Sequence, residues 1–346
     1  MYINAYLNLF IIVQKITIIF SLFLILAVTF FISISIGSVS VSLKEILNLF
    51  SPENEALRKI IIDIRLPRLL NAMLVGAALS CSGIVLQSLL NNNLAEPGLL
   101  GISSGAGLGA ILIFILPVSL PFIFITPVSF VFALASTLLI IFIARGIGGG
   151  HTDHISSNKI ILTGIAISAF ISSVNGLLML ISGSSVIQIL YWLNGGFSGR
   201  GWNEFSVSVF FILTGLFISV LISKDLNVLS LGEEFSSSIG LNLKRMQRVA
   251  IFAASLLAAS AVSVAGIISF VGLVIPNLSR LLIGNDHRYS VVCSILLGAI
   301  FMLLSDTIAR IVIAPSELPV GIITSFIGAP VFVWLILKKK RSFNEK

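Results

Sequence analysis

Apolar residues follow one another along this chain in long runs, and short polar segments separate them. The runs lack the alternation of apolar and polar positions that a membrane β-strand requires. Most approach the roughly 20 residues that a helix needs to cross a bilayer. The pattern predicts ten spans, at about 17–38, 66–90, 98–116, 122–144, 160–181, 204–223, 249–267, 269–283, 290–311 and 320–337. We therefore expect an all-α, polytopic membrane protein, with residues 1–346 forming a single transmembrane domain.

Composition supports this prediction, because 57% of the residues are hydrophobic and 10% are charged, with a mean hydropathy of +1.12. The net charge of +7 could suggest nucleic acid as a partner, but the basic residues flank apolar runs, as membrane anchors do. We therefore exclude nucleic acid and expect the lipid bilayer as the surroundings. Cys81 and Cys293 lie inside apolar runs, where we expect buried thiols.

An even number of spans places both termini on one side, and the basic tail 338–341 indicates the cytoplasm. In that topology 14 of the 21 lysines and arginines are inside and 7 are outside. Apolar positions in 43–50 follow helical spacing and predict a short helix at the outer surface. The apolar stretch within 182–203 is too short to span and predicts a half-helix entering from outside.

Small residues repeat on single helix faces in two places: Gly101, Gly105 and Gly109, and Gly76, Ser80 and Gly83. Such faces allow helices to pack closely in lipid, which predicts a compact bundle. The segment beginning at Ser80 also resembles the one beginning at Ser263, so we expect two weakly related halves around a path.

Catalytic chemistry is not evident in the sequence. It contains no phosphate-binding G-x-x-x-x-G-K-[ST] motif, and the predicted spans hold only two acids, Glu204 and Asp306. Arg310 follows Asp306 by four positions, so the two predict a structural pair. The motif GGGHTDH, with His151 and His154, has too few firm ligands for a metal site, and His287 is expected in a loop or helix cap. An intramembrane enzyme or an ion-coupled transporter would require more ionisable groups in the spans.

The polar segment 229–248, LSLGEEFSSSIGLNLKRMQR, lies on the predicted cytoplasmic side. Glu233 and Glu234 favour a helix start, Gly240 can end that helix, and Asn242 can cap the next. A solvated linker is the alternative, but a linker would not require residues that start, end and cap helices. The segment predicts a compact knob on which an ATPase docks.

The chain resembles the permease subunits of ABC importers for iron–siderophore complexes, haem and cobalamin, the FecCD type. The resemblance rests on RLPRLLNAMLVGAALSCSG, NLAEPGLLGISSGAGLGA, YWLNGGFSG, LGEEFSSSIGLN, GIISFVGLVIP, NDHR and ELPVGIITSFIGAPVFVWLIL. It implies a bacterial cytoplasmic membrane, two cytoplasmic ATPase subunits, an extracytoplasmic substrate-binding protein, and a second permease copy or paralogue. This chain would bind no cofactor, and ATP and Mg would be held by the ATPase.

The same resemblance implies three groups of site residues. The ATPase-coupling residues would be Glu233, Glu234, Phe235, Ser237 and Gly240. The residues that grip the binding protein at the outer surface would be Arg65, Arg68 and Arg310. The cytoplasmic gate residues would be Asn92, Leu94, Ser157 and Asn158.

Two positions depart from the family pattern. Asn93 stands where a proline is usual, so the gate loop loses a fixed dihedral angle, and Asn277 stands where a histidine is usual. The resulting prediction is a permease that moves an iron chelate, with cobalamin as the alternative cargo. An ion-coupled secondary transporter is the competing class, and the scarcity of acids in the spans argues against it.

Overall fold

The structure is a computed structural model that describes residues 2–37, 54–116, 122–146 and 157–344. All regular elements among these residues are helices. Eight are long and apolar enough to cross a membrane. The long helices are α1 (Tyr2–Ser35), α4 (Leu66–Leu89), α6 (Ile125–Gly146), α7 (Ser157–Ile181), α9 (Trp202–Leu221), α12 (Leu243–Ala265), α14 (His287–Ile311) and α15 (Val320–Asn344). With the shorter apolar helices α5 (Ile102–Ile115) and α13 (Val271–Ile283), they match the ten predicted segments and confirm the fold class.

Several helix boundaries differ from the prediction. The short helix α3 (Glu55–Lys59) and the π-helical segment η2 (Ile60–Arg65) run into α4, so one helical stretch extends over 35 residues. An apolar run marks membrane depth, whereas helical hydrogen bonding continues until a breaker intervenes, and 55–66 contains neither glycine nor proline. The predicted half-helix is present as α8 (Val186–Leu193) after η5 (Gly183–Ser185). The helix predicted at 43–50 lies outside the described residues.

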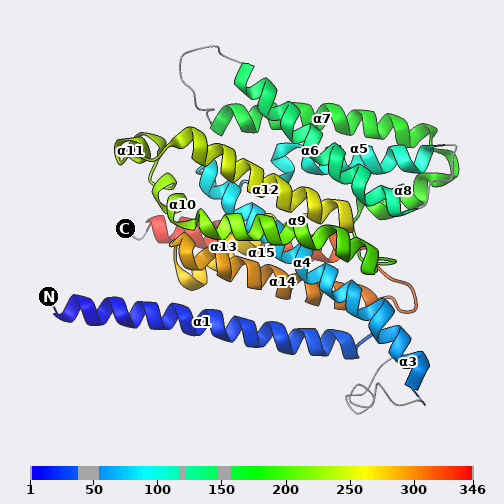
Figure 1. Ribbon diagram of the computed structural model, residues 1–346, viewed down its shortest axis with the longest axis horizontal. Coiled ribbons are helices and arrows are strands. Elements are labelled where there is room, and N and C mark those ends of the chain that lie inside the picture. The colour runs from blue at the N-terminus through cyan, green and yellow to red at the C-terminus, as the bar shows by residue number, and fades with distance from the viewer. Residues whose placement is uncertain (1, 38–53, 117–121, 147–156, 345–346) are drawn as a thin grey trace.

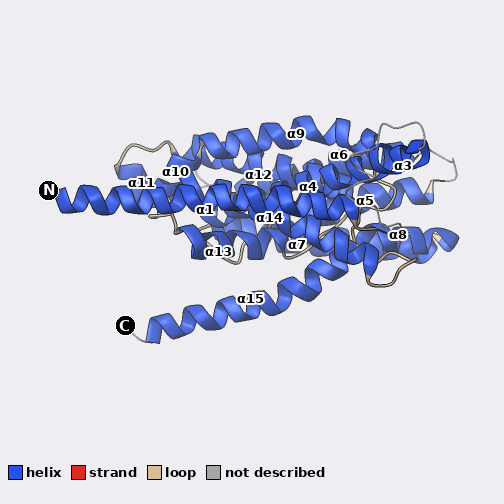
Figure 2. Ribbon diagram, turned by 90° about the horizontal axis from the view of Figure 1, so that it is seen from below, coloured by secondary structure: helices blue, strands red, loops and turns tan. Residues whose placement is uncertain are grey.

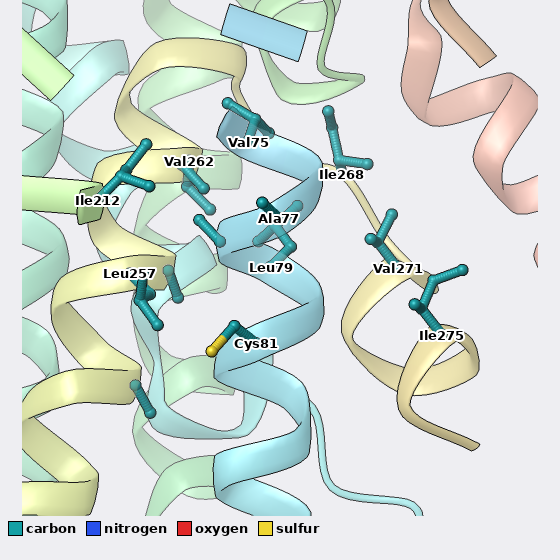
Figure 3. Packing of buried hydrophobic residues seen from close by; sticks show 14 of the residues in the cluster. Val75, Ala77, Leu79, Cys81, Ile212, Leu257, Val262, Ile268, Val271 and Ile275 are labelled. Carbon is teal, nitrogen blue, oxygen red and sulfur yellow. The ribbon is translucent and has the colours of Figure 1, made fainter. Parts of the chain in front are cut away.

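Helix α4 forms the centre of the bundle. Its side chains pack between α12, α9 and α13, as the buried cluster around Leu79, Cys81 and Leu257 shows (Figure 3). In the most apolar windows of α4 and α12, 83% of the residues are buried, compared with 17% for α7 and 22% for α15. The outer helices therefore present apolar surface to lipid or to a partner. Both cysteines are free and buried, as predicted.

Close helix packing depends on the small residues that the sequence analysis identified. A Cβ atom on Gly76 would overlap the carbonyl oxygen of Gly298, and one on Gly83 would overlap that of Gly272. These glycines bring α4 into backbone contact with α14 and α13, which confirms the predicted compact packing.

The two ends of the bundle differ in kind (Figures 1 and 2). The start of α1, the end of α15 and the short helices α10 (Ser223–Leu229) and α11 (Glu233–Ser238) lie at one end, which we call the α11 end. Helices α3 and α8 lie at the opposite end, called the α8 end. The two remaining elements are the 3-10 turns η3 (Pro97–Leu100) and η4 (Phe122–Phe124). This arrangement agrees with an even number of spans.

Candidate functional site

A buried charge cluster joins distant parts of the chain at the α8 end. The Asp306 carboxylate in α14 accepts hydrogen bonds from Arg68 in α4, with Nη2 at 2.8 Å and Nε at 3.1 Å from Oδ1. Arg68 Nη1 also donates to Glu317 at 3.0 Å. Arg310 Nε lies 3.1 Å from Asp306 Oδ2, which confirms the predicted pair as an ion pair. Asp306 therefore neutralises cations from two helices.

Arg310 of this cluster and the neighbouring Arg65 also bind the end of α1. Arg65 Nη1 donates to the Ile34 carbonyl at 2.7 Å, and Arg310 donates to the carbonyls of Ser33 at 3.0 Å and Ile36 at 2.9 Å. The last carbonyls of a helix have no partner within the helix. The arginines supply those donors and fasten α1 to η2 and α14.

The three arginines that the resemblance assigns to docking at the outer surface are buried in this chain. Arg65, Arg68 and Arg310 are 6%, 8% and 6% exposed. They do lie together, but the cluster's carboxylates and the carbonyls of α1 occupy their guanidinium groups. The sequence spacing showed Arg310 beside Asp306, whereas Arg68 comes from 238 positions away.

A cavity of about 670 Å³ opens beside the cluster, between α4, α8 and the loops that follow α8 and precede α15. Arg68, Glu317, Tyr191 and Arg200 contribute to its wall. Burial lowers the pKa of Arg200, and its buried Nε has no hydrogen-bond partner among the described residues. Sequence reasoning did not single out Arg200 as a site residue.

A second cavity, of about 430 Å³, lies between α5 and α7. Ser168, Ser172 and Asn175 line it from α7 at helical spacing, and the buried Ser168 hydroxyl and Asn175 amide oxygen are unpaired in the described structure. None of the described residues that line it carries a charge. The arrangement offers neutral hydrogen-bonding groups in a hollow between α5 and α7. The spacing of small polar residues on α7 was the signal that the sequence analysis missed.

At the α11 end, two glycines with positive φ angles flank α11, Gly232 at +107° and Gly240 at +93°. The helix starts at Glu233, and the Asn242 side chain accepts from the Arg245 backbone N–H at 3.0 Å at the start of α12. These predicted features are confirmed. The sequence analysis did not predict the separate helix α10.

The buried Ser236 hydroxyl fixes α11 to α10, with carbonyl oxygens at 2.8 Å on Val228 and 2.6 Å on Gly232. Three apolar residues at intervals of four, Leu231, Phe235 and Ile239, are 63%, 50% and 59% exposed. Exposed apolar side chains spaced this way mark a surface suited to a partner. We call these three residues the α11 stripe.

A polar route connects α10 to α4. The Asn227 amide donates to Asp286 at 2.9 Å, and its oxygen accepts from the His287 backbone N–H at 2.8 Å. His287, 3% exposed, also shares a side-chain hydrogen bond with Ser88 near the end of α4. The Arg288 guanidinium holds the pKa of Asp286 well below its usual range. His287 is thus the buried first residue of α14 and not a loop residue.

The proposed gate residues lie at the same end. Ser157 and Asn158 line a cavity of about 260 Å³. The same cavity is lined by Asn91, which precedes Asn92 in the chain, and by Leu229 and Gly232 from the turn before α11. The start of α7 is thereby brought to the end of α4 and to the α10–α11 turn. In the loop after α4, the Asn92 side chain accepts from the Leu94 backbone N–H at 2.9 Å, and Leu94 is 54% exposed.

The two departures from the family pattern contact each other. The Asn277 amide donates to the Asn93 carbonyl at 3.1 Å. The Gln87 amide holds the same loop through the Ala95 carbonyl at 3.2 Å, and burial raises the pKa of Glu96. Side-chain amides thus fix the gate loop at a position without the usual proline.

No group of three or more potential metal ligands occurs among the described residues. His151 and His154 lie outside them, so the structure does not test the prediction made for those histidines.

Comparisons with known proteins agree with this geometry. The model of the FecCD transport family matches residues 25–338. The hemin transport system permease protein HmuU of Yersinia pestis is 38% identical over 309 residues, covering 89% of this chain and 91% of HmuU. The vitamin B12 import system permease protein BtuC of Citrobacter koseri is 40% identical over 281 residues, covering 81% and 83%. A solved structure assigned to the metal-chelate type of ABC transporter, in an inward-facing conformation, matches with a TM-score of 0.83 at 32% identity, covering 93% of this chain and 99% of the other.

Proposed function

The chain belongs to the FecCD transport family and is a membrane-embedded permease subunit of an ABC importer, and we propose that its cargo is an iron chelate, either a ferric siderophore or haem. The observation that carries the proposal is the match to a metal-chelate type transporter over 93% of the chain. The uncharged polar cavity between α5 and α7 supports it, because hydroxyl and amide groups can contact a bulky polar chelate without holding it tightly. Cobalamin is the second candidate, favoured by the 40% identity to BtuC.

Partners are proposed for each end of the bundle. We place the α11 end in the cytoplasm of a bacterial cell, with both termini there. Two ATPase subunits dock on the α11 stripe and on the neighbouring Glu233, Glu234, Ser237 and Gly240. They hold the ATP and Mg, and this chain supplies no cofactor-binding residue. A second permease, as a copy or a paralogue, completes the path.

The extracytoplasmic binding protein docks at the α8 end. Arg65, Arg68 and Arg310 remain the proposed recognition residues, although their burial changes the mechanism. In this proposal acidic groups of the binding protein approach Arg68 and Glu317 in the wall of the 670 Å³ cavity. One of them takes the place of Glu317 as a partner of Arg68. Such contacts steer docking and are screened by salt.

The cargo proposal is tested by uptake into cells that express this chain with its ATPase and binding protein. A labelled ferric siderophore or haem is expected to accumulate. A deletion of the permease gene serves as the control. Accumulation of cobalamin with no iron chelate taken up would overturn the cargo assignment.

The docking proposal has its own test. Raising the salt concentration is expected to weaken association of the binding protein with the permease. Association of the two proteins that does not depend on salt would remove the arginines from docking.

Movement of the ATPases is proposed to reach the gate through Asn227, His287 and Ser88. Cysteines at Leu94 or Asn158 are expected to cross-link to their counterparts in the second permease with a yield that depends on bound nucleotide. Asn227→Ala removes the bonds from α10 to Asp286 and His287, so it is expected to abolish most of this nucleotide dependence. Asn203→Ala, at the opposite end, is the matched control. In the protein that keeps Asn227, a cross-linking yield that does not depend on nucleotide would exclude Leu94 and Asn158 from the gate.

A further inference from the structure

A larger cavity at the α11 end, of about 660 Å³, shares Ser88, His287 and Leu231 with the transport cycle described above, but its basic side chains have no role in that cycle. Its wall comes from the end of α4 and the loop that follows, the α10–α11 turn, α13, the start of α14 and the last turns of α15. The cavity therefore lies between membrane-spanning helices at the level where they leave the bilayer.

The described side chains that line this cavity carry positive charge and no negative charge. Arg280 of α13 and Lys338 of α15 are both in the wall, and none of the described side chains that line it is an aspartate or glutamate. Arg280 Nη1 donates to amide oxygens, at 2.6 Å to Gln87 and at 3.4 Å to Asn93. In the described part of the chain no ion pair involves Arg280. The next acid along the chain, Asp286, is already paired with Arg288 at 2.6 Å.

Neutral donors surround these cations. The side-chain amides of Asn91 and Asn285 line the cavity, and neither makes a hydrogen bond that involves other described residues. An amide NH2 group offers two donors to an acceptor oxygen. A guanidinium group with an ammonium and free amide donors is the donor set that binds phosphate oxygens.

Apolar surface adjoins the charged wall. Leu281 of α13 is 52% exposed and lines the cavity with Leu335 of α15. Lys338 follows Leu335 by one helical turn, and its ammonium lies 5.1 Å from the centre of the Trp334 ring. Lys338 is also the first residue of the basic tail 338–341. Basic pockets between spanning helices, next to apolar surface, suit the headgroups of anionic lipids.

We propose that this cavity binds an anionic phospholipid, with the phosphate at Arg280 and Lys338 and an acyl chain along Leu281 and Leu335. The inference rests on the proposed orientation only in assigning the lipid to the cytoplasmic leaflet. It does not depend on which cargo is carried, so its failure would leave the importer assignment unchanged.

The test places the full-length chain in nanodiscs of equal phosphatidylglycerol and phosphatidylcholine and counts retained lipids by native mass spectrometry. Phosphatidylglycerol is expected to be enriched. Arg280→Gln and Lys338→Gln are each expected to lower the enrichment about fivefold, the factor for about 1 kcal/mol per basic residue at an anionic membrane surface. Arg145→Gln is the matched control, because Arg145 is an exposed cation at the end of α6 outside the cavity.

Lys338→Gln keeps the test decisive if Arg280→Gln disturbs folding through Gln87, because Lys338 is exposed at the end of α15. A second arm measures binding of labelled inorganic phosphate in discs of phosphatidylcholine alone. Equal retention of the two lipids by the unaltered protein would overturn the proposal, as would an enrichment that neither substitution changes. Phosphate binding that Arg280→Gln abolishes, without a lipid preference, would assign the cavity to free phosphate and also overturn it.

Discussion

Replacing Phe235 by aspartate is expected to separate this permease from its ATPase while the bundle stays intact. Phe235 is the central residue of the α11 stripe and is 50% exposed, so the substitution removes no core contact. A buried aromatic anchor at a protein interface commonly contributes at least 2 kcal/mol, which corresponds to about a 30-fold loss of affinity. Burying the new carboxylate without a partner adds a further cost.

The measurement is co-purification of the ATPase with the permease, together with cargo-stimulated ATP hydrolysis in proteoliposomes. Ser238→Asp is the matched control, because Ser238 is also exposed on α11 and lies outside the stripe. The control is expected to retain the complex. If Phe235→Asp retained the ATPase as well as the control does, the α11 stripe would not be the docking surface.

Replacing Asp306 by asparagine is expected to destabilise the protein by about 3–5 kcal/mol, the usual cost of removing one partner from a buried ion pair. The side chain of Asp306 is 0% exposed and lies within 3.1 Å of both Arg68 and Arg310. The substitution leaves two buried cations with only Glu317 to balance them. Because Arg310 also donates to carbonyls at the end of α1, that helix is expected to loosen first.

Glu317→Gln is the matched control, since it makes the same chemical change on the other partner of Arg68. The Glu317 side chain is 34% exposed, so water can replace part of the interaction, and the expected cost is below about 1 kcal/mol. Thermal unfolding in nanodiscs measures both variants. Equal stability of the two would contradict the assignment of Asp306 as the organising charge.

The sequence predicted the ten apolar helices because a spanning helix must be apolar over its whole length, whatever its neighbours are. It also predicted the start and end of α11, since Glu233 and Gly240 act through local backbone preferences. The close packing at Gly76 and Gly83 could also be predicted, because small residues on one helix face allow the backbone of another helix to approach closely.

The charge cluster could be predicted only in part. Asp306 and Arg310 are one helical turn apart, so their spacing revealed the pair, whereas Arg68 meets Asp306 only after the bundle has formed. The burial of the arginines could not be predicted, because position at a membrane edge does not reveal which carboxylates lie nearby. The Asn227–His287–Ser88 route was missed for the same reason, since its members come from three separate helices.

The most direct test of the central claim asks what energy drives uptake. The claim is that this chain provides the path while ATP hydrolysis on a partner subunit drives transport. Uptake of the labelled chelate is measured with the intact ATPase, with an ATPase whose phosphate-binding lysine is replaced by alanine, and with a protonophore under conditions that maintain cellular ATP. We predict that the lysine substitution abolishes uptake and that the protonophore leaves it largely unchanged. Uptake that survives loss of ATP hydrolysis and collapses with the protonophore would contradict the account and identify an ion-coupled transporter.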